Sequence, residues 1–276
     1  CRRNHRELLS TVLKGSAHLM RVTVLGSGSS SGVPGVGIGW GACDPENPKN
    51  QRLRPSILVE EGGKTILVDT SPDLRQQLLN ADISRLDAVL LTHFHADHLH
   101  GIDDLRPINR AMNATLDLYA DVATIEAVNQ RFGYVFEPLA ENATMYYKPT
   151  LVPETIGDGD RLSIGGIDID VFVQEHGYCQ TLGFRFGDIA YSTDVVELPD
   201  HAFQVLDGVH TWIIGTLVDK PHETHAHVDK ALQWIERVRP KRAVLTHLGL
   251  GLDYDELSER LPDSVEAAYD GLILAT

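Results

Sequence analysis

A chain of 276 residues with 42% hydrophobic side chains can form one large packed α/β domain or two small ones, so disorder is excluded as the default state. The formal net charge of -15 argues against bulk binding to nucleic acid or acidic lipid, because an acidic surface repels both, although a small anionic substrate held by metal is still allowed. Three scattered cysteines and the lack of any run of about 20 apolar residues argue against a disulfide framework and a membrane span, so we expect a cytoplasmic protein.

The first half of the chain predicts strands and helices that lead to a histidine-rich turn. The first strand is expected at 21–25, directly after Met20, so residues 1–19 are interpreted as an upstream extension or an expression remnant and residues 20–276 as one domain. A glycine and serine loop over 26–41 comes next. A β-hairpin is expected at 57–60 with 64–69, and a short helix after Pro72. A buried strand at 86–91 ends at the histidines, and a longer helix is expected at 121–131.

The second half predicts a further set of strands with helices outside them. Residues 142–153 are irregular and are interpreted as a surface excursion. A strand is expected at 167–173, a second hairpin at 182–186 with 189–192, and another strand at 211–214. A helix is expected at 228–238, followed by two closing strands at 242–246 and 272–274. Because no internal repeat or linker interrupts this order, one α/β domain of two packed sheets with outer helices is predicted.

Four potential metal ligands lie within six positions directly after the buried strand, in the segment from His93 to His98. Adjacent side chains of an extended stretch point to opposite sides, so His93 and His95 can share one ion. Asp97 and His98, at a tightening turn, can reach another. The alternative is a solvated polar turn, which gives histidines no reason to crowd together there. The segment therefore predicts part of a two-metal site.

Three further candidates, His176, Asp194 and His247, each follow a predicted strand. A lone histidine at a strand end is more often capped or solvated than bound to metal. All three are nevertheless expected at the mouth of a sheet. Together they supply the coordination that one segment cannot complete.

These motifs, in this order, resemble the metallo-β-lactamase superfamily. The resemblance runs from about Arg21 to the C-terminus and includes an aspartate that ends a strand, Asp69, followed by the His-x-His-x-Asp-His motif. It implies a four-layer αβ/βα sandwich with a metal cleft between its two sheets and two divalent metal ions, zinc or manganese. The resemblance implies that His93, His95 and His176 hold the first ion and that Asp97, His98 and His247 hold the second. It implies that Asp194 bridges the two ions and that Asp69 orders the ligand loop.

Two features narrow the resemblance within the superfamily. The aspartate at the bridging position favours oxygen-rich coordination over a cysteine-containing, antibiotic-hydrolysing site. The glycine loop and the segment 98–106 resemble the phosphodiesterase branch typified by the phosphonate-pathway cyclic-phosphate hydrolase, to which transfer-RNA 3′-processing ribonucleases are related. Members of the first group often carry a cysteine-rich structural zinc site after the glycine loop, whereas this chain offers one cysteine there, Cys43.

The histidine-bearing stretch before the helix at 228–238 also resembles both groups. His227 matches the general acid that the resemblance implies, and His225 and Glu223 are weaker contenders. His227 would protonate a leaving alkoxide, because an imidazole with a pKa of about 6.5 is a suitable donor near neutrality.

The glycine and serine loop leaves two interpretations open. Its backbone N–H groups could approach a phosphate, or the loop could be a tight crossover. A dinucleotide fingerprint is disfavoured because position 31 is serine, and a serine hydrolase because no matching acid and base are apparent. Ser29, Ser30 and His225 are the expected substrate contacts.

The resemblance therefore implies a dinuclear metal-dependent phosphodiesterase that cuts a small or cyclic phosphodiester by attack of a metal-bridging hydroxide. Catalytic roles are expected for Asp69, Asp97 and His227. One alternative is a transfer-RNA 3′-processing endoribonuclease, disfavoured by the acidic balance and the lack of a long basic, glycine-rich arm. Another is a non-catalytic metal-binding protein. The expected partner is a small phosphodiester or nucleotide-like substrate, with no membrane, and a homodimer is compatible with the sequence.

Overall fold

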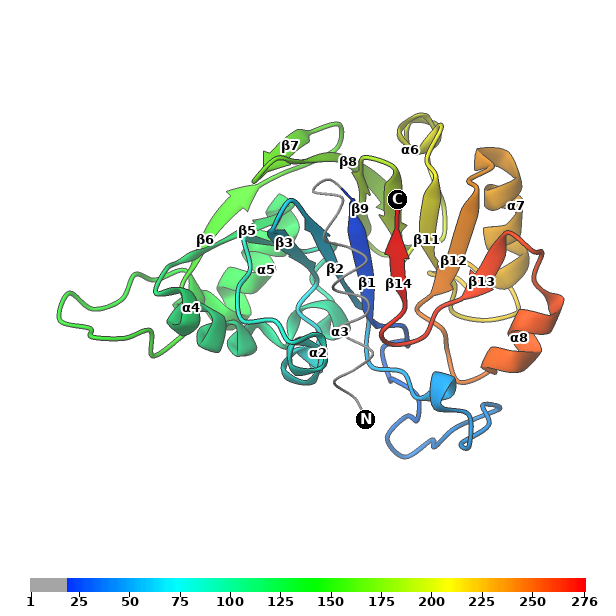
Figure 1. The fold of residues 1–276 in the computed structure, drawn as a ribbon, viewed down its shortest axis with the longest axis horizontal. Helices are drawn as coiled ribbons and strands as arrows, with labels where there is room; N and C mark the ends of the chain where they lie inside the picture. Colours follow the sequence, from blue (N-terminus) through cyan, green and yellow to red (C-terminus); the bar gives the residue numbers. More distant parts are fainter. Residues whose placement is uncertain (1–18) are drawn as a thin grey trace.

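Two facing sheets of seven strands each form the centre of the computed structural model, which describes residues 19–276 (Figure 1). The segment set apart in the sequence, residues 1–19, lies outside the described residues except for Leu19. The first sheet contains, in spatial order, β14 (Ile273–Ala275), β1 (Arg21–Gly26), β2 (Ser56–Glu61), β3 (Lys64–Val68), β4 (Ala88–Leu90), β5 (Leu116–Ala120) and β6 (Leu151–Thr155).

The second sheet mirrors the first in size. Its strands, again in spatial order, are β13 (Val265–Ala267), β12 (Arg242–Thr246), β11 (Thr211–Gly215), β10 (Ile189–Ser192), β9 (Gln180–Phe186), β8 (Ile167–Glu175) and β7 (Arg161–Ile164).

Alternating side chains explain why the sheets stack. Successive residues of a strand point to opposite faces, so Ile66 and Val68 of β3 enter the core between the sheets while Leu67 packs outward against helices. In the second sheet Ile213 faces the same central core and Trp212 packs outward. Strands that are buried on both faces require nearly continuous apolar runs, which is what these segments contain.

Helices cover the outer face of each sheet. Figure 1 shows those of the first half on the left and α7 and α8 on the right. The first sheet is covered by α2 (Leu74–Ala81), α3 (Ala96–Leu99), η3 (Ile102–Leu105), α4 (Arg106–Met112), α5 (Val122–Phe132) and η4 (Gly133–Val135), and the second by α6 (Asp200–Leu206), α7 (Val228–Val238) and α8 (Tyr254–Arg260), with η2 (Pro48–Asn50) in a loop. The predicted four-layer αβ/βα sandwich is confirmed.

The surface excursion expected at 142–153 ends earlier than predicted. A loop between η4 and β6 extends outward on the left of Figure 1, but it ends before Leu151, where β6 begins. Backbone pairing with β5 places residues 151–153 in the first sheet. Within residues 19–276, no helix combines the length and apolar character needed to cross a bilayer.

Strand direction fixes the position of the candidate site. β3 and β4 run parallel, as do β10, β11 and β12, and β8 shares the direction of β10 because both pair antiparallel with β9. The carboxyl ends of parallel strands lie at one edge of a sheet, where ligand sites of α/β proteins usually form. The residues that follow these strands are therefore brought to the same edge.

The segment after α3 packs closely against the end of β3 at Gly101. A Cβ at this position would lie 1.9 Å from the carbonyl oxygen of Ser71, and the Gly101 N–H donates to the Thr70 carbonyl at 2.8 Å. Because a backbone carbonyl cannot move aside cheaply, we expect Gly101→Ala to lower the free energy of unfolding by about 2–3 kcal/mol in urea denaturation.

Gly157→Ala is the matched control, because no atom lies within 4 Å of its added Cβ. Its free energy of unfolding is expected within about 0.5 kcal/mol of the parent protein. Equal losses in the two variants would contradict the packing described here.

Candidate metal centre

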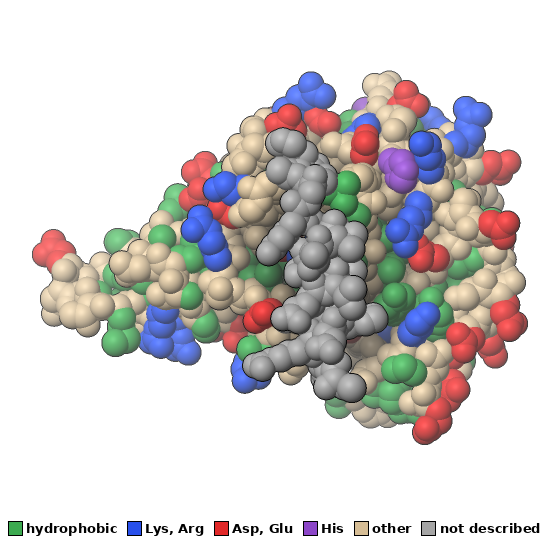
Figure 2. Space-filling view, in the orientation of Figure 1, with side chains coloured by type: hydrophobic (Ala, Val, Ile, Leu, Met, Phe, Trp, Pro, Cys, Tyr) green, Lys and Arg blue, Asp and Glu red, His purple; other side chains and the backbone are tan. Residues whose placement is uncertain are grey.

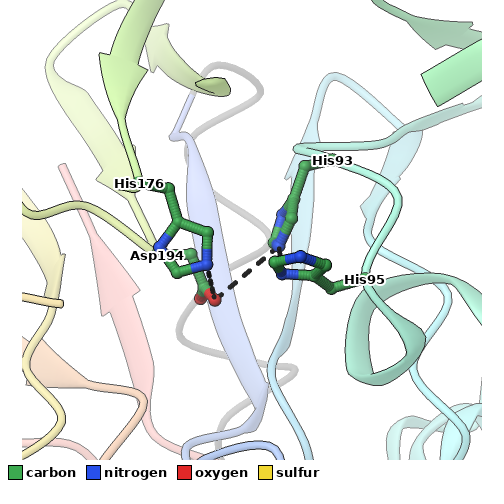
Figure 3. A group of neighbouring side chains, drawn as sticks. All are labelled: His93, His95, His176 and Asp194. Atoms are coloured by element: carbon green, nitrogen blue, oxygen red, sulfur yellow. Dashed lines mark hydrogen bonds and ion pairs between the residues drawn. The ribbon is translucent and has the colours of Figure 1, made fainter. Parts of the chain in front are cut away.

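Seven side chains converge at the shared edge and form two overlapping sets of potential ligands. In each set the ligand atoms lie within 4.8 Å of one another. Figure 3 shows the first set, with His93 and His95 facing His176 and Asp194. The three-histidine group consists of His93, His95, His176 and Asp194, and the two-aspartate group consists of Asp97, His98, Asp194 and His247.

Asp194 belongs to both groups, and its two oxygens divide between them. Oδ2 lies 3.4 Å from Nε2 of His176 and 3.7 Å from Nε2 of His93. Oδ1 lies 3.1 Å from Nε2 of both His98 and His247. This is the geometry of a carboxylate that can bridge two ions.

In three of the imidazoles, Nδ1, the nitrogen that faces away from Asp194, has a polar partner. Nδ1 of His98 lies 2.6 Å from Oδ2 of Asp69, Nδ1 of His93 lies 3.0 Å from Oγ1 of Thr92, and Nδ1 of His176 lies 2.6 Å from a backbone carbonyl. Such outer contacts orient a metal-binding imidazole and leave its other nitrogen turned to the ion.

The chemistry of the set fits divalent metal ions. Nε2 of His98 is buried without a hydrogen-bond partner, although carboxylate oxygens of Asp194 and Asp97 lie 3.1 and 3.4 Å away. Nε2 of His93 and Nδ1 of His95 approach to 2.9 Å, which suits two lone pairs directed at one ion. These nitrogen and oxygen donors could therefore hold an ion in each group.

Three residues of the centre adopt left-handed backbone conformations at strand ends. The φ angles of Asp69, Asp194 and His247 are 66°, 46° and 58°. A non-glycine residue in this region costs about 1–3 kcal/mol, and such strain persists where surrounding contacts over-determine the conformation. At all three positions the backbone turns sharply as it leaves the sheet.

Asp69 lies outside both ligand groups. It is fully buried and accepts hydrogen bonds from the backbone N–H of Thr92 at 2.8 Å and from its hydroxyl. Because Asp69 also contacts His98, it fixes the start and the end of the histidine motif. This position supports the loop-ordering role implied by the sequence.

Burial and charge set different protonation states in the two groups. Burial lowers the pKa of His93 well below its usual value and that of His176 to about 4, so both are neutral near pH 7, the form that binds metal. Burial also opposes charge on His98, but the carboxylates of Asp194, Asp97 and Asp69 outweigh it and raise its pKa well above the usual value. In the metal-free protein His98 therefore keeps a proton.

The structure brings His225 to the centre and leaves His227 apart. His227 is the residue before α7, is half-buried, and has no described side-chain interaction with the seven residues. Nε2 of His225 lies 3.2 Å from Oδ2 of Asp194, and its ring stacks on His247 with centroids 5.2 Å apart. His225, the weaker candidate for the general acid in the sequence, therefore lies closer to the seven ligand residues than His227.

The glycine and serine loop favours the crossover interpretation. The N–H groups of Gly28 and Ser29 donate to carbonyls of neighbouring loops at 2.8 and 3.2 Å, so neither is free for a phosphate. A Cβ on Gly28 would meet Arg52 at 2.9 Å, which explains the need for glycine. Ser29 is buried and Ser30 is exposed, and neither side chain contacts the seven residues in the described structure.

Residues 64–248 match the beta-lactamase superfamily domain. The chain belongs to the metallo-β-lactamase superfamily. One solved superfamily member, described as a new diphosphatase from the PhnP family, is similar to this chain with a TM-score of 0.85 and 33% sequence identity. The similarity covers 94% of this chain and 97% of that one.

Two curated relatives carry different names. The octanoyltransferase of Porphyromonas gingivalis is 34% identical over 256 residues, which are 92% of this chain and 51% of that protein. The ribonuclease Z of Bradyrhizobium diazoefficiens is 35% identical over 144 residues, 50% of this chain and 46% of that enzyme. The matched part of this superfamily member thus spans about half the length of each of these relatives.

The protonation states predict that the two groups lose metal at different pH. A proton on His98 competes with an ion from a higher pH, because its pKa is raised, whereas protons displace an ion from His176 only near its pKa of about 4. As zinc-loaded protein is dialysed from about pH 8 towards about pH 4, the two-aspartate group is expected to lose its ion first, seen as a stepwise fall in metal content.

Asp97→Ala serves as the control, because it removes a ligand of the two-aspartate group alone. Its single remaining ion should be lost at the lower-pH step. Simultaneous loss of both ions in the parent protein, or loss from Asp97→Ala at the higher-pH step, would contradict this assignment.

Proposed function

We propose that the chain is a metal-dependent phosphodiesterase that uses two divalent metal ions, either zinc or manganese, to hydrolyse a small or cyclic phosphodiester. The observation that carries the proposal is the Asp194 carboxylate, which has one oxygen in each ligand group. The 33% identity to a diphosphatase over nearly the whole chain supports phosphate as the reacting group.

The metal ions, when bound, would activate water and neutralise charge on the phosphate. The residues of the chain do the remaining work. Histidine and aspartate without thiolate make a set that accepts zinc and manganese, and neither Cys43 nor Cys179 belongs to either group. Asp69 and Thr92 hold the histidine motif in place.

His225 is the proton donor in this proposal, in place of His227. Its Nε2 faces the cleft beside Asp194, and the Thr224 hydroxyl lies 2.8 Å from its Nδ1, which fixes the ring. Burial lowers the pKa of His225 although the charge of Asp194 opposes this, so the protonated ring is the minor form near neutrality but is the stronger acid when it forms. A leaving alkoxide held at the ions would lie within its reach.

The described cysteines argue against acyl transfer of the kind that the name octanoyltransferase suggests. Acyl transfer through cysteine needs a thiolate, which forms where the pKa is lowered. Burial instead raises the pKa of Cys43, and it raises that of Cys179 to about 11. Neither described cysteine is therefore an activated nucleophile.

Ribonuclease Z activity is the second candidate, because the identity to that enzyme reaches 35% over half of this chain. Charge argues against it. The net charge is -15, and the part of the face not covered by grey atoms in Figure 2 carries lysine and arginine scattered among acidic side chains. A long polyanion would gain little from such a surface.

The substrate class is tested with metal-loaded protein on bis(p-nitrophenyl) phosphate and on a precursor transfer RNA. We expect metal-dependent turnover of the small ester, abolished by a chelator and by Asp194→Ala, and no specific cleavage of the RNA. Specific 3′ cleavage of the RNA would favour the ribonuclease. Bound metal without turnover of either substrate would show a non-catalytic metal-binding protein.

The proton donor is tested with His225→Ala and His227→Ala on a phosphodiester with an alkyl leaving group and on one with nitrophenolate. Only the alkoxide needs a proton, so His225→Ala should lose about 100-fold in kcat on the alkyl ester and far less on the nitrophenyl ester. His227→Ala should stay near the parent rate on both.

Metal content is measured in both variants, because His225 contacts Asp194. A loss confined to the alkyl ester in His227→Ala would return the role to that residue. Equal loss on both esters in His225→Ala would show that it is no proton donor.

A further inference from the structure

Tyr178 stands two residues after the ligand-group member His176, and the proposed chemistry does not use it. Its side chain is 85% exposed, the most exposed aromatic ring among residues 19–276. An aromatic ring left in water forgoes the burial that usually stabilises it, so an exposed ring beside a candidate active site is a candidate binding surface.

Backbone hydrogen bonds close the turn that carries Tyr178. The backbone N–H of His176 donates to the Cys179 carbonyl at 2.9 Å, and that of Tyr178 donates to the His176 carbonyl at 3.0 Å. Gly177 between them has a φ of 79°, and a Cβ there would lie 2.8 Å from the Thr224 side chain. The turn therefore packs directly against the segment 222–225.

The hydroxyl at the outer end of the ring has a hydrogen-bond partner. The Tyr178 hydroxyl donates to Oε2 of Glu223 at 3.2 Å. The next residue, Thr224, accepts from Nδ1 of His176 through its carbonyl at 2.6 Å, and His225 follows with its ring 4.6 Å from that of His176. The turn at 176–179 and the segment 222–225 thus form one wall beside the metal centre, with the exposed Tyr178 ring at its rim.

We propose that Tyr178 binds the flat organic group of the substrate, a nucleobase or a comparable aromatic ring, while the phosphate lies at the metal centre. The inference rests on the proposed phosphodiesterase function and adds a substrate class to it. The backbone of Tyr178 lies in a hydrogen-bonded turn and its hydroxyl has a partner, so its side chain loses less conformational entropy when a flat group stacks on it. Stacking accepts any nucleobase, because each base has a π face.

Charge at the rim selects the same kind of group. The partner that holds Tyr178 is the exposed carboxylate of Glu223, and the neighbouring His222 ring lies 5.2 Å from His225. A carboxylate repels a second phosphate and tolerates an uncharged ring. This wall therefore suits the organic part of a monoester or diester.

The test compares two ligands that differ only in the flat group. Adenosine 5′-monophosphate and ribose 5-phosphate share the sugar phosphate, and calorimetry on the zinc-loaded protein gives the Kd of each. The parent protein is expected to bind the nucleotide about tenfold more tightly than the sugar phosphate. Tyr178→Leu should remove this difference by weakening the nucleotide alone, and Tyr178→Phe, which keeps the ring, should retain most of it.

The outcomes separate the two proposals. Equal affinity of the parent protein for both ligands, or an undiminished difference in Tyr178→Leu, would overturn the role of Tyr178 and leave the phosphodiesterase proposal intact. If neither ligand binds the loaded protein and no ester is turned over, the proposed function itself fails. Thermal melting of Tyr178→Leu is expected to match the parent protein, because the side chain is largely exposed.

Discussion

The buried carboxylate of Asp194 is the constraint on which the rest of the structure depends. It is 2% exposed, and Nε2 atoms of five histidines lie within 3.7 Å of its oxygens. A buried charge is costly unless opposite charges or ions compensate it, so the fold must bring partners from both sheets to this point. The strained backbone at Asp69, Asp194 and His247 is retained because these contacts determine it.

The architecture supplies those partners through strand direction. Strands buried on both faces form two stacked sheets, and their parallel carboxyl ends open at one edge. Short turns after β4, β8, β10 and β12 then carry the ligand side chains, and the outer helices cover the faces that do not take part. Asp69 adds a second layer of support behind His98, so the centre is oriented before any ion binds.

The sequence predicts most of the ligand groups because each residue sits one or a few positions beyond a strongly apolar strand. The resemblance selects His227 over His225, but both precede α7 in an irregular segment, and only tertiary packing shows that the His225 ring turns to Asp194. The edge strands β7 and β13 escape prediction for a different reason. The first has four residues and the second three, so the alternation of each is too short to be distinguished from a loop. Strand β5 does alternate, and its pattern could have been recognised.

The central claim is that one carboxylate joins two metal ions, and anomalous diffraction from crystals of the metal-loaded protein tests it most directly. We expect two peaks, one among His93, His95 and His176 and the other among Asp97, His98 and His247, each about 2.0–2.2 Å from an oxygen of Asp194. A single peak in the cleft, or two peaks of which only one touches Asp194, would contradict the account.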